Sequence, residues 1–401
     1  MEVNDSEKCH LPYPSGPFAT GCIDLMTEYS PEGCFARIFY PTDIPSEQIN
    51  EYSDKWMPWM PNETYLRGFA SSLRIPFFVF KYGPYLIRQK PHYIPTICDA
   101  PLSKALESYP LLVFSHGFAA TRFVCSEYCN SIASHGFIVV AIEHRDTSAP
   151  ATFYYDSPES VKNDQCTWVD HVHLHQICDN DHYLLRNKQL KYRFKEMEKL
   201  LDTLSEINNG APVENIINYS FDLEQFKGKL NFNKVIVAGY SFGGSTAMYT
   251  AANDKRIKTA VIIDGWMFPI KSEPFLNIDQ PILFINSQTF HIPSNISVLR
   301  KYFNSKGIRQ LYTLKNTTHE SHTDTPYIWG YWLDIIMWKK LDPETALKIQ
   351  SYLTIRFLRD HAGYPTNADS AQIYLKEHSD DITDDFISYT KTIKRKMGIF
   401  W

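Results

Sequence analysis

The pentapeptide Gly239-Tyr240-Ser241-Phe242-Gly243 constrains the fold of this chain more than any other feature. It follows an apolar run at residues 234–238 and precedes a helical pattern at residues 242–253. A serine between such glycines, at a strand-to-helix junction, is typical of a nucleophile elbow, which holds the hydroxyl above the edge of a sheet. Glycines are needed because the tight turn brings these positions against neighbouring backbone. We therefore interpret Ser241 as a candidate nucleophile.

Short apolar runs alternate with longer helical patterns along most of the chain. Nearly continuous apolar strands separated by helices indicate a mostly parallel sheet with helices on both faces. The carboxyl ends of such strands meet at one edge, where these sheets place their sites. The expected strands are 34–40, 110–115, 137–142, 234–239, 258–263, 281–287 and 309–314. The expected helices are 121–134, 182–206, 242–253, 294–305, 325–340 and 343–359.

No repeat or long linker divides the sequence, so we expect a single domain over residues 1–401. Residues 41–100 are rich in Pro, Trp, Phe and Tyr and fit the alternation poorly. We interpret them as an insertion near the active-site edge. Residues 378–401 are expected to form a C-terminal tail.

A serine hydroxyl needs a histidine to take its proton and a carboxylate to orient that histidine. Asp264 ends an expected strand on the same edge as Ser241 and is the favoured carboxylate; Asp254 and Asp279 are weaker candidates. His319 follows the strand 309–314 and is the favoured base. His322 and His291 compete with it.

The oxyanion hole of such a site uses two backbone N–H groups, one directly after the nucleophile and one in a loop after an earlier strand. The first is the amide of Phe242. The second is expected at Phe118, because Gly117 before it permits a close approach of the backbone.

The charge balance excludes a nucleic-acid binder, because 40 Lys and Arg face 45 Asp and Glu and the formal net charge is −5. No apolar run approaches the ~18–20 residues that span a bilayer. The first 30 residues lack the apolar core of a signal peptide, and Glu2 stands where myristoylation requires glycine. These features predict a cytoplasmic protein, with peripheral membrane association and a secreted form left open.

The eight cysteines all lie within the first 178 residues and form no Cys-x-x-Cys pair, so we expect mostly reduced thiols. A metal or other cofactor is not expected. One cluster has side chains of the kind that bind metals, but we interpret it as a solvated face. Its residues are Asp170, His171, His173, His175, Cys178 and His182. His144-Arg145-Asp146 is similar to a kinase catalytic loop, but the other kinase motifs do not accompany it.

Taken together, several short motifs resemble the platelet-activating factor acetylhydrolases, also called group VII phospholipases A2. The resemblance runs from about Gly21 to about Leu358. Its motifs are Phe114-Ser-His-Gly-Phe118, Ala133-Ser-His-Gly-Phe-Ile-Val139, Glu143-His-Arg-Asp146, Phe242-Gly-Gly244, Asp264-Gly-Trp-Met-Phe-Pro269, Phe284-Ile-Asn-Ser287 and His319. One departure is Tyr240, which stands where the family commonly has histidine.

The resemblance implies an α/β-hydrolase fold with Ser241 as nucleophile, Asp264 as orienting acid and His319 as base. It implies a calcium-independent esterase that removes short or oxidised acyl chains from the sn-2 position of phospholipids. Two other functions stay open: a carboxylesterase or lipase acting on soluble esters, and a catalytically silent α/β-hydrolase that binds a partner.

An esterase of this kind without a lipid anchor must reach phospholipid at a membrane or lipoprotein surface through its own side chains. Residues 75–87 combine aromatic and basic side chains, which suit a headgroup boundary, and Phe77, Phe78 and Phe80 are the expected contacts. A second aromatic stretch, residues 327–338, is apolar on most faces, and we expect it to be buried.

Overall fold

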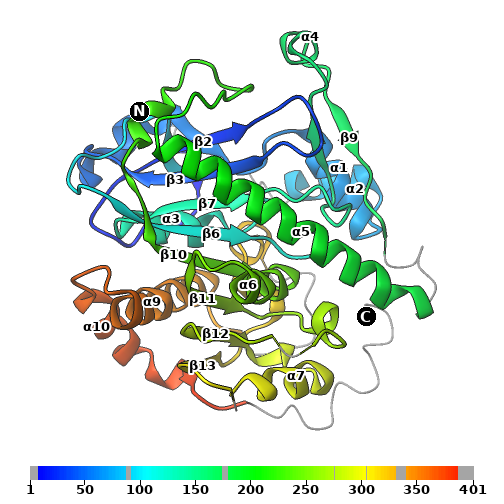
Figure 1. Cartoon of the computed structure of the whole chain (residues 1–401), viewed down its shortest axis with the longest axis vertical. Helices are drawn as coiled ribbons and strands as arrows, with labels where there is room; N and C mark the ends of the chain where they lie inside the picture. The colour runs from blue at the N-terminus through cyan, green and yellow to red at the C-terminus, as the bar shows by residue number, and fades with distance from the viewer. Residues whose placement is uncertain are drawn as a thin grey trace.

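The computed structural model describes residues 8–86, 92–173, 179–274, 276–303, 305–330 and 340–386. Within these ranges a twelve-stranded sheet runs through the centre of the molecule in the order β1-β5-β2-β3-β7-β6-β10-β11-β12-β13-β14, with β4 paired to β5 (Figure 1). The strands are β1 Cys9–His10, β2 Thr20–Met26, β3 Phe35–Pro41, β4 Trp56–Pro58, β5 His92–Cys98, β6 Tyr109–Ser115, β7 Ile138–Ile142, β10 Leu230–Tyr240, β11 Ile257–Ile263, β12 Ile282–Ser287, β13 Arg309–Leu314 and β14 Ile382–Thr383.

The six strands from β7 to β13 are parallel to one another, whereas β3 pairs antiparallel with both β2 and β7, and β14 pairs antiparallel with β13. Parallel strands of this kind are buried on both faces, and β6, β7 and β12 are buried at every position. The expected mostly parallel sheet and the α/β-hydrolase fold class are therefore confirmed.

Helices cover both faces of the sheet. Alternate residues of β6 separate the two cores: Leu112 and Phe114 pack in the core that includes α3 and α9, and Leu111 and Val113 pack in the core that includes α5, α6 and α7. Figure 1 shows α5 and α6 crossing one face of the sheet. The helices are α1 Glu63–Ser72, α2 Phe77–Leu86, α3 Ser126–Ser134, α4 Pro158–Lys162, α5 Asp179–Asn208, α6 Phe242–Asn253, α7 Pro293–Phe303, α8 Thr325–Trp329, α9 Pro343–Ala362 and α10 Asp369–Glu377.

Local sequence signals set the ends of α9. The Asp342 carboxylate accepts a hydrogen bond from the Thr345 amide at 2.9 Å, and Pro343 occupies the first turn, where its missing N–H costs nothing. Gly363 ends the helix in the left-handed conformation, with φ 67°. Caps of this kind leave few orphan backbone groups at either end.

All seven expected strands are present. Each expected helical range contains a helix, but α3 begins only at Ser126 rather than at residue 121, and α8 ends at Trp329; residues 331–339 lie outside the described part of the chain. Strands β2 and β5 were not expected. The segment 41–100 and the tail 378–401 were expected to lie outside the sheet, but both contribute strands to it. β4 and β5 lie within residues 41–100, and β14 lies within the expected C-terminal tail.

The rest of the 41–100 segment forms α1 and α2. The Tyr65 hydroxyl on α1 donates a hydrogen bond to Glu143, which directly follows β7, so α1 lies at the carboxyl edge of the sheet. We retain as a proposal that α1 and α2 are an insertion beside the site. In the described residues, no helix is both long and apolar enough to cross a bilayer.

Candidate active site

The elbow residue Ser241 lies between the end of β10 and the start of α6, with φ 56° and ψ −116°. Such a backbone conformation costs a non-glycine residue about 1–3 kcal/mol and is kept where a site needs it. The flanking glycines are explained by close contacts. A Cβ atom on Gly239 would lie 2.0 Å from the Gly243 carbonyl oxygen, and one on Gly243 would lie 1.9 Å from the Ser115 carbonyl oxygen.

Three strand ends bring the favoured candidates together. The His319 Nε2 atom lies 3.0 Å from the Ser241 Oγ atom, and the His319 Nδ1 atom lies 3.0 Å from an Asp264 carboxylate oxygen. Asp264 directly follows β11, and His319 lies in the loop after β13. This is the arrangement in which an imidazole can take a proton from a serine hydroxyl.

The competing candidates lie elsewhere. Asp254 caps α6 and pairs with Arg256 at 2.6 Å. Asp279 precedes β12 and is therefore at the opposite edge from Asp264. His291 Nδ1 contacts the Ser287 carbonyl oxygen at 3.0 Å.

His322, the other competing histidine, lies against the same carboxylate rather than against the serine. Its Nε2 atom is 3.6 Å from the Asp264 Oδ2 atom, and its Nδ1 atom bonds Gln350. Burial lowers the pKa of His322 below its usual value.

Asp264 is fully buried, and its surroundings keep it ionised. Burial by itself raises the pKa of this carboxyl group, but His322, His319 and the Ser287 hydroxyl outweigh that effect, so the pKa is lowered from 3.8. Ser287 donates from both its amide, at 2.7 Å, and its hydroxyl. In the sequence Ser287 stands out only as the last residue of the motif Phe284-Ile-Asn-Ser287, and its contact with Asp264 could not be predicted because it depends on β12 lying next to β11.

Two aromatic rings hold the imidazole of His319. The Phe290 ring stacks on it with a centroid distance of 3.9 Å and an interplanar angle of 14°, and the Tyr240 ring stacks at 4.8 Å and 27°. The Tyr240 hydroxyl also donates to the His319 carbonyl oxygen at 3.1 Å. Tyr240, the departure from the family pattern, thus fixes the histidine loop through both its ring and its hydroxyl.

The loop after β6 packs against the nucleophile. A Cβ atom on Gly117 would lie 3.1 Å from the Ser241 Cβ atom, so only glycine allows this approach without a shift of its neighbours. The loop continues into Phe118, and Phe242 begins α6. Of the two residues expected to supply oxyanion amides, Phe242 directly follows Ser241, and Phe118 directly follows Gly117, the glycine that packs against Ser241.

Arg193 on α5 holds this loop through hydrogen bonds to its backbone carbonyl groups. The guanidinium is fully buried and donates to the carbonyl oxygens of His116 at 2.6 Å and Gly117 at 3.3 Å. It also pairs with Asp146 at 2.8 Å and lies 4.2 Å from the centre of the Phe242 ring. None of these partners is near Arg193 in sequence, so no local motif marks it as a residue of the site.

The kinase-like triplet has a structural explanation. Asp146 holds Arg193, and the His144 ring contacts the Ser115 hydroxyl at 2.8 Å. Arg145 donates to the carbonyl oxygen of Gly33 at 2.6 Å. The triplet is a buried polar network behind the β6 loop.

Aromatic side chains cluster around Phe118. Its ring lies 5.3 Å from His171 and 6.4 Å from Trp266, and Trp266 stacks on Phe268 at 5.5 Å. The rings of His171 and His173 meet edge-on with a centroid distance of 4.7 Å, while His175 and Cys178 lie outside the described residues. Among the residues that the structure describes, no group of three or more His, Cys, Asp or Glu side chains could hold a metal ion.

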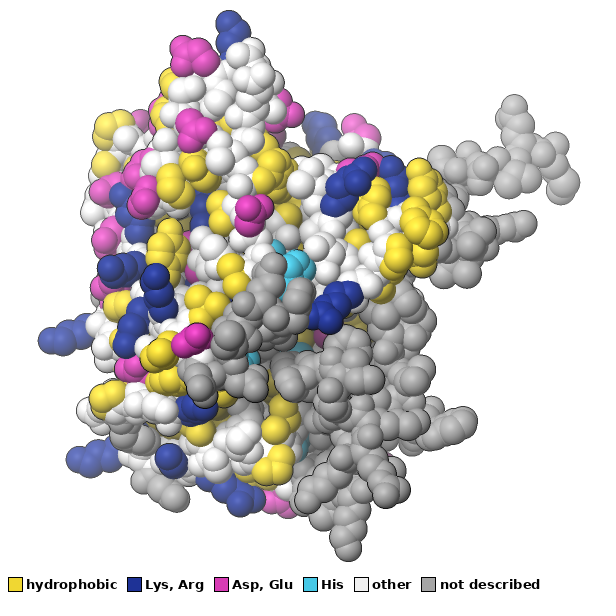
Figure 2. Space-filling model, turned by 90° about the vertical axis from the view of Figure 1, so that its right-hand side faces the viewer, with side chains coloured by type: hydrophobic (Ala, Val, Ile, Leu, Met, Phe, Trp, Pro, Cys, Tyr) yellow, Lys and Arg dark blue, Asp and Glu magenta, His cyan; other side chains and the backbone are white. Residues whose placement is uncertain are grey.

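The aromatic helix α2 differs in part from expectation. Phe80 is only 6% exposed and packs edge-on against Trp329 at 5.3 Å, so it is unable to touch a membrane. Phe77 is half-buried, with the Arg67 guanidinium 3.8 Å from its ring centre. Phe78 is 66% exposed, together with its neighbours Val79 and Tyr82. Figure 2 shows hydrophobic side chains next to Lys and Arg side chains on one face of the molecule.

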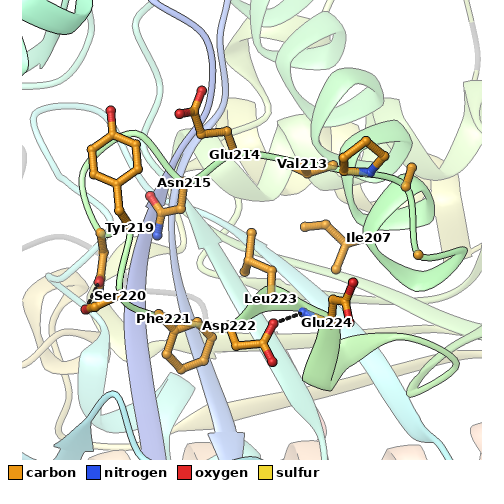
Figure 3. Close-up of a pocket in the computed structure, with 14 residues that line it drawn as sticks. Ile207, Val213, Glu214, Asn215, Tyr219, Ser220, Phe221, Asp222, Leu223 and Glu224 are labelled. Carbon is orange, nitrogen blue, oxygen red and sulfur yellow. Dashed lines mark hydrogen bonds between the residues drawn. The ribbon is translucent and has the colours of Figure 1, made fainter.

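A hollow of about 480 Å³ lies away from these residues, in the loop that follows α5 (Figure 3). Its lining, residues 207–224, includes none of the candidate site residues. Asp222 in its wall already accepts a hydrogen bond from the Glu224 amide at 2.9 Å, as the dashed line in Figure 3 marks. We assign this hollow no chemistry.

Comparisons with known proteins support the fold of this chain and show its family. A ferulic acid esterase from Streptomyces cinnamoneus superimposes with a TM-score of 0.61 and 18% identity, over 90% of this chain and 94% of the esterase, which supports the fold alone. The platelet-activating factor acetylhydrolase of Bos taurus is 33% identical over 90% of this chain and 79% of its own length. That of Cavia porcellus is 31% identical over 94% and 83%. The family model for platelet-activating factor acetylhydrolase, isoform II, matches residues 3–382, and the chain belongs to this family.

Proposed function

We propose that this protein is a calcium-independent serine esterase that hydrolyses the sn-2 acetyl, short or oxidised acyl ester of platelet-activating factor and related phospholipids. The single observation that carries the proposal is the continuous hydrogen-bonded series from Ser241 through His319 to Asp264. Membership of the acetylhydrolase family supports the choice of substrate.

In the first step, His319 Nε2 takes the proton of Ser241 while the Oγ atom attacks the sn-2 carbonyl carbon. Asp264 accepts from His319 Nδ1, so it fixes the tautomer and stabilises the imidazolium that forms. The imidazolium then gives its proton to the departing lysophospholipid oxygen. Water, activated by the same imidazole, hydrolyses the acyl-serine and restores the enzyme.

The negative charge on the former carbonyl oxygen is held by the amides of Phe118 and Phe242. The amide of Phe242 lies at the N-terminus of α6, where the helix dipole also favours an anion. Donors of this kind typically contribute about 2.7–4 kcal/mol each to stabilisation of the transition state.

We further propose that the exposed part of α2 contacts the lipid surface. Phe78, Val79 and Tyr82 supply apolar area, and Lys81 and Arg67 lie on the same part of the molecule, joined to Glu63 by ion pairs. Aromatic and basic side chains together suit the headgroup boundary. Phe80 is excluded from this contact because it is buried.

Acyl release tests the substrate class. Phospholipid vesicles carrying a ladder of sn-2 chain lengths would be compared with a soluble acetyl ester, using wild type and Ser241→Ala. The proposal expects release that falls with unoxidised chain length, is unaffected by a calcium chelator and is absent in Ser241→Ala. A wild type that cleaves only the soluble ester would make it a general carboxylesterase, and one that cleaves neither would make it a binding protein.

A further inference from the structure

Two cysteines that the proposed function does not use face each other across neighbouring strands. Cys22 on β2 is the direct register partner of Cys98 on β5, and the two strands are parallel. Hydrogen-bonded strands lie about 4.8 Å apart, which falls within the Cα separation of about 4.4–6.8 Å that a disulfide accepts. Register partners point to the same face of a sheet. Both thiols are unbridged in the structure.

A cavity gives this pair access to small molecules. It has a volume of about 280 Å³ and is lined by both cysteines together with Asp24, Met57, Asp99 and Asn218, among others. Cys22 is fully buried in its wall, whereas Cys98 is half-buried, and its sulfur lies 4.0 Å from the sulfur of Met57. An oxidant in the cavity would therefore reach Cys98 first.

The two sulfurs have different acidities. A hydrogen bond with Cys22 lowers the pKa of Cys98, and the Arg37 guanidinium adds to this effect against burial and the charges of Asp99 and Asp24. Burial raises the pKa of Cys22 well above its usual value. One Arg37 nitrogen, Nη1, is buried without a hydrogen-bond partner, so its charge is not fully satisfied by the ion pair with Asp24. Cys98 is thus the better thiolate and Cys22 the better hydrogen-bond donor.

We propose that Cys22 and Cys98 are an oxidation site, in which a peroxide converts the dithiol into a disulfide between β2 and β5. The Cys98 thiolate attacks one peroxide oxygen and the O–O bond breaks. The departing oxygen takes up the proton that the Cys98 thiol released, so the products are a sulfenic acid at Cys98 and water or, for a lipid hydroperoxide, an alcohol. The Cys22 sulfur then attacks the Cys98 sulfur, its proton leaves with the hydroxyl group as water, and the S–S bond forms. Two electrons pass from the two sulfurs to the peroxide.

The bridge would join β2 to β5, the strands that precede and follow α1 and α2 in the sequence. It closes a loop from residue 22 to residue 98, and a long closed loop restricts the unfolded chain strongly. The oxidised protein therefore unfolds at a higher temperature than the reduced one. The inference concerns residues outside the candidate triad and is independent of the substrate.

Peptide mapping of the wild-type protein tests the proposal directly. The reduced full-length chain is treated with stoichiometric hydrogen peroxide, remaining thiols are alkylated, and the digest is analysed without reduction. The expected result is one cross-linked peptide pair joining Cys22 and Cys98, reversed by dithiothreitol. Cys22→Ala should stop at a sulfenic acid on Cys98 that dimedone traps, and Cys98→Ala should give neither product.

Cys166→Ala is the matched control, because Cys166 is also half-buried, but burial and Asp164 rather than a second thiol raise its pKa. It should leave the cross-link unchanged. The proposal is overturned if Cys98 is oxidised no faster than Cys9 or Cys166 in the wild type. A cross-link from Cys98 to any other cysteine would overturn it as well.

Discussion

Replacing Arg193 by lysine tests whether the buried guanidinium positions the oxyanion loop. Arg193 donates to two consecutive carbonyl groups, those of His116 and Gly117, and also to Asp146 and Ser148. An ammonium group is a single point donor on a flexible stem, so it is unable to reproduce this fork. The amide of Phe118 directly follows the two carbonyl groups, and its direction should loosen.

The magnitude follows from what the loop does. Complete loss of one oxyanion donor costs about 2.7–4 kcal/mol, or about 100-fold to 1,000-fold in kcat. Arg193→Lys keeps the charge and the Phe118 amide but loses part of the alignment, so we expect kcat to fall about 10-fold to 100-fold. KM should change by less than about 3-fold, because the guanidinium lies beneath the loop and Arg193 touches neither Ser241 nor His319 in the described contacts.

The assay is steady-state hydrolysis of a soluble acetyl ester, combined with the affinity for a trifluoromethyl ketone, which forms a tetrahedral oxyanion with the serine. Lys191→Gln, on the exposed side of the same helix, is the control for the effect of a substitution in α5 on folding. A folded Arg193→Lys protein with wild-type kcat and wild-type ketone affinity would refute the positioning role. A rise in KM of about 10-fold to 100-fold with unchanged kcat would also refute the positioning role of Arg193.

Three further changes test other parts of the account. Asp264→Asn should lower kcat about 10,000-fold, measured by ester hydrolysis, because the amide no longer holds His319 in the tautomer that accepts the serine proton; a loss of less than about 10-fold would contradict that role. Burial raises the pKa of Glu127 from 4.5 to about 8, so the folded state binds a proton that the unfolded state has released, and stability falls as the pH rises from about 5 to 8. Glu127→Gln should reduce this loss of stability, measured by urea unfolding at pH 6 and pH 8.5. The exposed Glu377→Gln should not, and an unchanged pH dependence in Glu127→Gln would contradict the raised pKa of Glu127. Phe78→Asp should reduce vesicle co-sedimentation several-fold, whereas Tyr219→Asp, at a residue that is 60% exposed elsewhere, should not; equal binding by both variants would remove the membrane contact on α2.

Much of this fold could be predicted because its signals are local. The parallel strands at the centre are continuous apolar runs, and the elbow glycines stand beside the serine in sequence. Asp264 and His319 could be selected because each follows such a strand. The strand β2 could not be predicted because it contains Asp24, whose charge interrupts the apolar pattern and is compensated by Arg37 and Arg122 from elsewhere in the chain.

The supporting parts of the site depend on distant pairings that no local pattern encodes. Ser287 reaches Asp264 only because β12 lies beside β11, and Arg193 reaches the β6 loop only because α5 crosses that face of the sheet. The kinase interpretation of residues 144–146 was rejected because other kinase motifs are missing, but their contacts, such as that of Asp146 with Arg193, could not be predicted for the same reason. Phe80 was expected at the surface because aromatic composition alone does not show which side of a helix is covered.

The central claim is that Ser241 carries the acyl group during turnover. Wild-type protein would be mixed with an sn-2 acetyl phospholipid, quenched in acid within the first turnovers and digested for mass spectrometry. The account predicts an acetyl group on the peptide that contains Ser241, and none in Ser241→Ala, which also loses hydrolysis. Undiminished hydrolysis by folded Ser241→Ala, or an acetyl group found on another side chain, would contradict it.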